Sequence, residues 1–160
     1  MNATPHHVGC AVAHLDDAVN MYARALDVQR MTRAFDISSQ HVRVRFVELS
    51  NGLYLELISP VDSRARLASF MRAGFYHMAF LVDDLGRARS HLRAQGLFDL
   101  PLFESEAFNG RPCQFFQTPQ QHLIELVEMS SADFAGFFNA HLSEEHRPLM
   151  QNALPLLPSS

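Results

Sequence analysis

The chain has 160 residues and a formal net charge of -4; 48% of its residues are hydrophobic and 19% are charged. This composition is typical of one globular domain with a real core, and it excludes disordered and fibrous classes. A net negative charge does not favour binding to nucleic acid or to an anionic membrane surface, and no apolar run approaches the roughly 20 residues of a membrane span. The first residues lack the pattern of a signal peptide, so we expect a soluble cytoplasmic protein.

The first half of the chain predicts a strand, a helix and three further strands. Residues 6–13 form an apolar strand, and Asp16 or Asp17 can begin the helix that follows. The apolar positions of this helix recur at helical spacing: Val19, Tyr22, Ala23 and Leu26. The remaining strands are expected near residues 30–36, 41–49 and 53–59.

Residues 61–74 predict a short connecting helix, capped by Asp62 or Ser63 and ended by Gly74. The second half then repeats the order of elements. A strand over 76–82 precedes a helix that ends at Gly96, and further strands are expected near 102–107, 112–118 and 122–129.

A last helix follows residue 130 and carries one strongly apolar face, made of Phe134, Phe137, Phe138, His141 and Leu142. This face must pack against its own domain, against a second copy of the chain, or over a ligand pocket as a lid. We expect a homodimer on this ground. The two cysteines, Cys10 and Cys113, are too few for a disulfide framework and are expected to be buried free thiols.

The chain contains an internal duplication. At an offset of 70, His7-Val-Gly-Cys-Ala-Val12 aligns with His77-Met-Ala-Phe-Leu-Val82, and at an offset of 69 Glu56-Leu57 aligns with Glu125-Leu126. The sequence therefore predicts an α+β fold in which two tandem βαβββ modules, 5–60 and 75–129, form a curled mixed sheet around a cleft. These modules make one domain over 1–130, and residues 131–160 add the C-terminal helix and a tail.

The duplication brings out four candidate metal ligands: His7, Glu56, His77 and Glu125. A single histidine in an apolar strand is more often an ordinary core or surface residue than a ligand. Two glutamates among aliphatic residues at equivalent positions are harder to explain, because an unpaired buried carboxylate is costly. Two imidazoles and two carboxylates suit one divalent ion, either Zn, Ni, Co, Mn or Fe(II). Strand alternation predicts that His6 points to the opposite face from His7.

The sequence resembles the vicinal oxygen chelate superfamily, the group of glyoxalases, bleomycin resistance proteins, methylmalonyl-CoA epimerases and extradiol dioxygenases. The resemblance covers roughly residues 5–129. It is carried by the motifs His7-Val-Gly-x-Ala-Val, Leu55-Glu56-Leu57-Ile58-x-Pro60, Tyr76-His77-Met78-Ala79-Phe80 and Leu123-Ile124-Glu125-Leu126-Val127-Glu128. It implies a duplicated module with a divalent metal in the cleft, held by the same four residues, that binds two neighbouring substrate oxygens.

Within this superfamily the segment Glu56-Leu-Ile-Ser-Pro60 is most similar to the epimerase branch. The turn Thr118-Pro-Gln-Gln-His122 replaces the Asp-Pro-Asp-Gly turn common in glyoxalase I. Four retained ligands argue against the extradiol dioxygenases, which use three, and against antibiotic-binding members, which generally lack them. A small-molecule binding or resistance protein and an Fe(II)-dependent dioxygenase-like enzyme stay open as alternatives.

The resemblance implies a metal-dependent isomerase or lyase, either epimerase-like or lactoylglutathione lyase-like. Such an enzyme removes a proton next to a carbonyl or thioester and stabilises the resulting enolate. Glu125 is the expected base and Glu56 the second candidate. Family epimerases carry a further carboxylate on the preceding strand, where this chain has Val44. Glu48 has the same parity, but lies about 13 Å further along.

All thirteen basic side chains are arginines, which excludes a lysine nucleophile or Schiff base. Surface arginines are mostly solvated, yet some could bind an anionic substrate such as an acyl-CoA or a thiol conjugate. The best candidates are Arg111, which follows a turn glycine, and Arg45, which shares a strand face with Arg43. A further group lies between the modules: Arg64, Arg66 and Arg72.

Overall fold

The computed structural model describes residues 2–50, 52–65 and 74–144, and its elements repeat in the same order in both halves. The first half contains β1 (Ala3–Ala11), α1 (Leu15–Ala25), β2 (Val28–Met31), β3 (Phe35–Ile37), β4 (Val42–Leu49) and β5 (Tyr54–Pro60). The second half contains β6 (Phe75–Val82), α2 (Leu85–Ala94), β7 (Phe98–Asp99), β8 (Phe103–Ser105), β9 (Arg111–Gln117) and β10 (Leu123–Glu128). The chain then continues into α3 (Ser131–Ala140).

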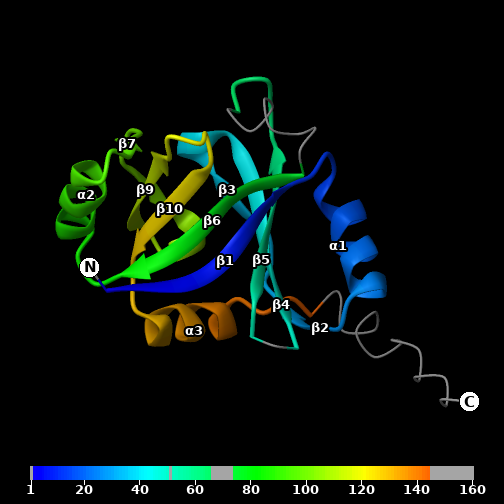
Figure 1. Cartoon of the computed structure of the whole chain (residues 1–160). Helices are drawn as coiled ribbons and strands as arrows, with labels where there is room; N and C mark the ends of the chain where they lie inside the picture. Colours follow the sequence, from blue (N-terminus) through cyan, green and yellow to red (C-terminus); the bar gives the residue numbers. More distant parts are fainter. Residues whose placement is uncertain (1, 51, 66–73, 145–160) are drawn as a thin grey trace, which may run out of the picture.

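The described strands form one ten-stranded mixed sheet with a symmetric order. The path is β2-β4-β5-β1-β6-β10-β9-β7, and the short strands β3 and β8 pair with β4 and β9. β1 and β6 are antiparallel neighbours at the centre, and each has a parallel partner on its outer side, β5 or β10. Figure 1 shows β1 and β6 side by side across the middle of the sheet, between α1 and α2. The predicted α+β class and its curled mixed sheet are confirmed.

Local chemistry places the helix ends close to their predicted positions. The side chain of Asp84 accepts a hydrogen bond from the backbone N–H of Arg87 at 2.8 Å and caps α2. Gly96 follows this helix with φ +85°, a conformation that glycine adopts at little cost. Helix α1 begins at Leu15, one residue before the predicted start, and has Asp16 and Asp17 in its first turn.

The strand predicted over 30–36 is divided into β2 and β3. The interruption lies at Thr32, whose hydroxyl accepts a hydrogen bond from the backbone N–H of Phe46 at 3.1 Å. The hydroxyl thus replaces a backbone carbonyl as the acceptor for Phe46, while the backbone N–H of Thr32 still donates to the carbonyl of Phe46 at 3.0 Å. The strand predicted over 102–107 is shorter in the structure, where β8 ends at Ser105 and a 3-10 turn begins at Glu106, and the short β7 lies before the predicted range.

The apolar face of α3 packs against the inside of its own sheet. Phe134, Phe137 and Phe138 are buried together with residues of β3, β4 and β9. This supports the interpretation in which the helix covers its own domain, since these rings are not available as a contact with a second copy. The homodimer stays a prediction without the support of this face.

The two cysteines are free thiols. Cys113 is fully buried, and burial raises the pKa of its thiol well above the usual range. Cys10 is half-buried. Most of the predicted connecting helix, including Arg66 and Arg72, lies outside the described residues. Within the described part of the chain, no helix combines the length and the apolar character that crossing a bilayer would require.

Candidate metal centre

The four predicted ligands are brought together by two rows of residues across the central strands. In one row Glu56 on β5 and His77 on β6 flank Gly9 on β1. In the other row His7 on β1 and Glu125 on β10 flank Ala79 on β6. Gly9 and Ala79 are equivalent positions of the duplication, 70 residues apart in the sequence. Each row thus places a small residue between two ligands.

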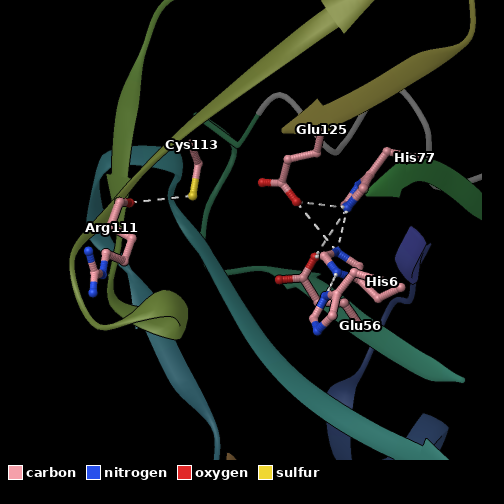
Figure 2. A network of polar contacts seen from close by, with 7 residues as sticks. His6, Glu56, His77, Arg111, Cys113 and Glu125 are labelled. Atoms are coloured by element: carbon pink, nitrogen blue, oxygen red, sulfur yellow. Dashed lines mark hydrogen bonds and ion pairs between the residues drawn. The ribbon is translucent and has the colours of Figure 1, made fainter. Parts of the chain in front are cut away.

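The small residues leave space for the ligands to converge. A Cβ atom added to Gly9 would lie 2.7 Å from Nε2 of His77 and closer still to Cε1 and Nδ1 of that ring. The imidazole of His77 therefore lies directly against the backbone of β1, where only glycine fits. Figure 2 shows His77 and Glu125 facing Glu56 and His6 across the cluster.

The ligand atoms form a tight, buried group. Nε2 of His7 lies 3.0 Å from Nε2 of His77, 3.3 Å from Oε2 of Glu56 and 3.4 Å from Oε2 of Glu125. Nε2 of His77 lies 3.4 Å from the same oxygen of Glu56 and 3.3 Å from that of Glu125. None of the four residues is more than 6% exposed.

These distances fit a single ion at the centre. Ligand atoms about 2.1 Å from one metal ion are separated by about 3.0 Å when their bonds meet at right angles and by about 3.4 Å at the tetrahedral angle. The five separations given above lie within that range. Oε2 of Glu125 is also buried, and it lies 3.4 and 3.3 Å from the two histidine nitrogens without a well-formed hydrogen bond to any described residue. Such an atom is explained by a cation that it faces.

Without a metal, the cluster holds protons. Burial opposes ionisation of Glu56, but hydrogen bonds to His7 and His77 outweigh it and lower the pKa of this carboxyl to about 2. Burial also opposes the charge on His77, but Glu125 and Glu56 outweigh it and raise the pKa of this ring to about 9. The pKa of His7 is raised and that of Glu125 lowered by the same balance.

Metal binding is therefore expected to release protons. His77 is protonated in the metal-free protein below about pH 9, whereas a metal ligand needs a free nitrogen lone pair. The metal affinity should fall by about tenfold per pH unit, for each proton released, as the pH drops from 9 to 6. Calorimetric titrations in buffers of different ionisation enthalpy count the protons. Binding at pH 7 without proton release would contradict this picture of the metal-free cluster.

The orientation of His6 differs from the prediction. We predicted that His6 points away from the site, but its Nδ1 lies 2.8 Å from Nδ1 of His7. The pairing of β1 with β6 shifts register between Pro5 and His7, which is a β-bulge, so alternation fails at this point. Burial, followed by the effect of His7, lowers the pKa of His6 to about 2, and its ring is neutral.

A small cavity opens from the carboxylates of the cluster. It has a volume of about 30 Å³, and Glu56, His77 and Glu125 form its polar end. Its other walls are largely apolar and include Val44 together with Ile37, Val42, Ile58, Phe103 and Phe115. A larger hollow of about 270 Å³ shares Tyr76, Phe103 and Phe115 with this cavity and is also lined by His41 and Arg64.

The two arginines predicted to bind substrate lie away from the cavity lining. Arg45 is buried, and it pairs in register with Leu57 on the sheet face opposite Val44 and Phe46. Arg111 lies apart from the cluster (Figure 2), and its guanidinium is 3.9 Å from the carboxylate of Asp133. Arg64 does line the hollow, but its side chain pairs with Asp62 at 2.7 Å.

Comparisons with known proteins agree with the motifs. A family model described as "Glyoxalase/Bleomycin resistance protein/Dioxygenase superfamily" matches residues 6–116. Among curated protein sequences there is no match. Similar solved structures include a methylmalonyl-CoA epimerase from Mycobacterium tuberculosis, at 26% identity and a TM-score of 0.69. That similarity covers 82% of this chain and 91% of the epimerase.

Two further structures share the fold at lower identity. A hypothetical protein from Bacillus halodurans is 21% identical with a TM-score of 0.70, over 82% of this chain and 97% of that one. A Streptomyces coelicolor methylmalonyl-CoA epimerase in complex with 2-nitronate-propionyl-CoA is 23% identical with a TM-score of 0.66, over 79% and 97%. Since the family model spans more than half of the sequence, this chain belongs to the glyoxalase, bleomycin resistance protein and dioxygenase superfamily.

Proposed function

We propose that this protein is a metal-dependent isomerase or lyase that removes a proton from the carbon next to a carbonyl or thioester. The observation that carries the proposal is the placement of the four-residue cluster at the end of a small cavity. Glu56 and Glu125 contribute to the cluster and also line that cavity. A carboxylate that lies beside both a cation and a substrate space can act as a base.

The chemistry of the donor set fits a divalent ion held by His7, Glu56, His77 and Glu125. When bound, such an ion supplies positive charge that polarises a carbonyl oxygen and stabilises the charge of an enolate. The ligand types suit Zn, Ni, Co, Mn or Fe(II). The largely apolar walls around Glu56 and Glu125 lower the local dielectric, which strengthens the electrostatic interactions inside the cavity.

Glu125 is the proposed base, and Glu56 is the second candidate. The carboxylate takes the proton from the carbon next to the carbonyl. Return of that proton on the same face to the adjacent carbon isomerises the substrate, whereas return to the original carbon gives exchange alone. Val44 lines the cavity where family epimerases have a further carboxylate, so a second base on that wall is missing from the described lining. This favours proton removal and return on one face of the substrate over inversion by two bases.

The size of the two spaces supports a substrate with a small reacting group and a larger remainder. The inner cavity of about 30 Å³ admits only a small reacting group, and the adjoining hollow of about 270 Å³ can receive the part of the substrate next to that group. The similar epimerase structures contain acyl-CoA ligands, 2-nitronate-propionyl-CoA and methylmalonyl-CoA. We propose an anionic acyl-CoA or thiol conjugate as the substrate class.

The test is solvent deuterium exchange by the metal-loaded protein with short acyl-CoA thioesters and hemithioacetals. We expect deuterium to exchange into the carbon next to the carbonyl at least about tenfold faster than the configuration of that carbon inverts. The reason is that a single carboxylate acts on one face of the substrate. Nuclear magnetic resonance measures the exchange, and chiral chromatography measures inversion. Tight binding of these compounds without exchange would favour a binding or resistance protein. Oxygen consumption with Fe(II) would favour a dioxygenase-like enzyme.

A further inference from the structure

A second imidazole contacts the metal-ligand histidine of β1 on the side away from the cluster. Nδ1 of His6 lies 2.8 Å from Nδ1 of His7, while Nε2 of His7 faces Glu56, His77 and Glu125. We propose that His6 is a positioning residue, which fixes the tautomer and orientation of His7 through a hydrogen bond between the two rings. The inference rests on the proposed metal centre and assigns a role outside its four ligands.

The protonation pattern of the two rings follows from the geometry. A metal ion at the cluster needs the lone pair of Nε2 in His7, so the proton of that neutral ring is on Nδ1. Nδ1–H of His7 then donates to Nδ1 of His6, which accepts because its own proton is on Nε2. Metal-bound histidines commonly donate their second N–H to a carboxylate, a carbonyl or water. In this protein the acceptor is a neutral imidazole.

Aromatic packing fixes the acceptor ring. Tyr54 is stacked on His6 with ring centroids 5.3 Å apart, and Phe134 from α3 meets it edge-on at 4.0 Å. Phe46 and Phe108 complete the surroundings at 6.3 and 6.2 Å. Nε2 of His6 is buried without a hydrogen-bond partner among the described residues. The ring is therefore held by packing, and the hydrogen-bond contact that it makes within the described chain is directed at His7.

The two metal-ligand histidines are held in different ways. His77 lies against Gly9, and its Nδ1 is buried without a hydrogen-bond partner within the described chain. The orientation of His77 thus depends on close backbone packing, whereas that of His7 depends on His6. A change at His6 should therefore alter the hydrogen bond of His7 and leave the packing of His77 unchanged.

Two variants separate the hydrogen bond from the packing. His6→Phe keeps an aromatic ring in the pocket and removes the acceptor, while His6→Asn keeps an acceptor oxygen close to the position of Nδ1. Binding of Zn²⁺ alone, measured by competition with a chelator, is expected to weaken by about 10- to 100-fold in the Phe variant. The Asn variant should bind within about threefold of the unchanged protein. Nitrogen-15 spectra of the Zn-loaded Asn variant should show a proton on Nδ1 of His7.

The outcomes distinguish the possible failures. Equal Zn²⁺ affinity in a folded His6→Phe variant and the unchanged protein would overturn the inference. An equal loss in both variants would also overturn it, because packing alone would then be responsible. If the Phe variant does not fold, the affinity and the spectrum of the Asn variant decide. Failure of the unchanged protein to bind Zn²⁺ would instead refute the proposed metal centre.

Discussion

Replacement of Glu125 by glutamine is expected to slow deuterium exchange by about 10²- to 10⁴-fold at saturating metal, the range associated with loss of a general base. The amide has nearly the same shape as the carboxylate but cannot accept the substrate proton. Exchange is measured by nuclear magnetic resonance with the most reactive thioester. Each sample is first titrated with metal until the rate no longer rises, so that weaker metal binding does not obscure the loss of the base.

Glu56→Gln is the matched variant, because Glu56 contributes to the same cluster and lines the same cavity. It should weaken metal binding and reduce exchange at saturating metal less than Glu125→Gln does. The reverse order would assign the base to Glu56. Unchanged exchange rates in both variants would exclude a carboxylate base at this cluster, and an unchanged metal affinity in both would contradict the four-ligand assignment.

Gly9→Ala is expected to weaken metal binding by at least about 100-fold and to destabilise the protein by about 1–3 kcal/mol, as overpacking does. The added methyl group would occupy the space of the His77 ring, which lies directly against the Gly9 backbone. Because β1 and β6 are neighbouring central strands, the ring cannot move away without shifting Nε2 from the cluster. Thermal unfolding with and without Zn²⁺ measures both effects.

Gly136→Ala provides the control. Gly136 lies within α3, and a Cβ atom added there would have no neighbour within 4 Å among the described residues. Alanine in a helix interior is more stable than glycine by about 0.5–1 kcal/mol, so this variant should unfold at a slightly higher temperature and bind metal normally. Normal metal binding by Gly9→Ala would show that the His77 ring does not need its observed position.

The duplication explains why so much of the candidate site could be predicted from the sequence. His7 and His77 align at an offset of 70, and Glu56 and Glu125 at an offset of 69. A symmetric sheet brings such equivalent positions together at its centre. The observed strand order has this symmetry, with β1 and β6 as its central pair. The convergence of four side chains could therefore be inferred without coordinates.

Other features depended on local irregularities. The alternation of side chains along a regular strand predicted the wrong face for His6. Pro5 indicated an irregularity here, because proline within a sheet is usually confined to edges and bulges. The orientation of Arg45 was predictable. Val44 was aligned to a cleft-facing position, so its neighbour had to face away. The break at Thr32 depends on a hydrogen bond that its hydroxyl accepts from the backbone N–H of Phe46 on β4, which periodicity does not reveal.

The roles of Gly9 and Ala79 were also missed, although a signal for them was present. Each lies two residues after the histidine of its module, and both are small. In a duplicated site, equivalent small residues beside equivalent ligands indicate close backbone contact. The position of Arg111 could not be inferred in this way, because its nearest charged partner is Asp133 on α3, a residue outside the duplicated modules.

The most direct test of the metal centre is X-ray absorption spectroscopy of the metal-free protein after addition of one equivalent of Zn²⁺. The expected spectrum shows a single site in which two imidazole nitrogens and two carboxylate oxygens lie about 2.0–2.2 Å from zinc. A spectrum of hydrated zinc, or of a coordination shell without imidazole, would contradict the assignment of His7, Glu56, His77 and Glu125 as metal ligands.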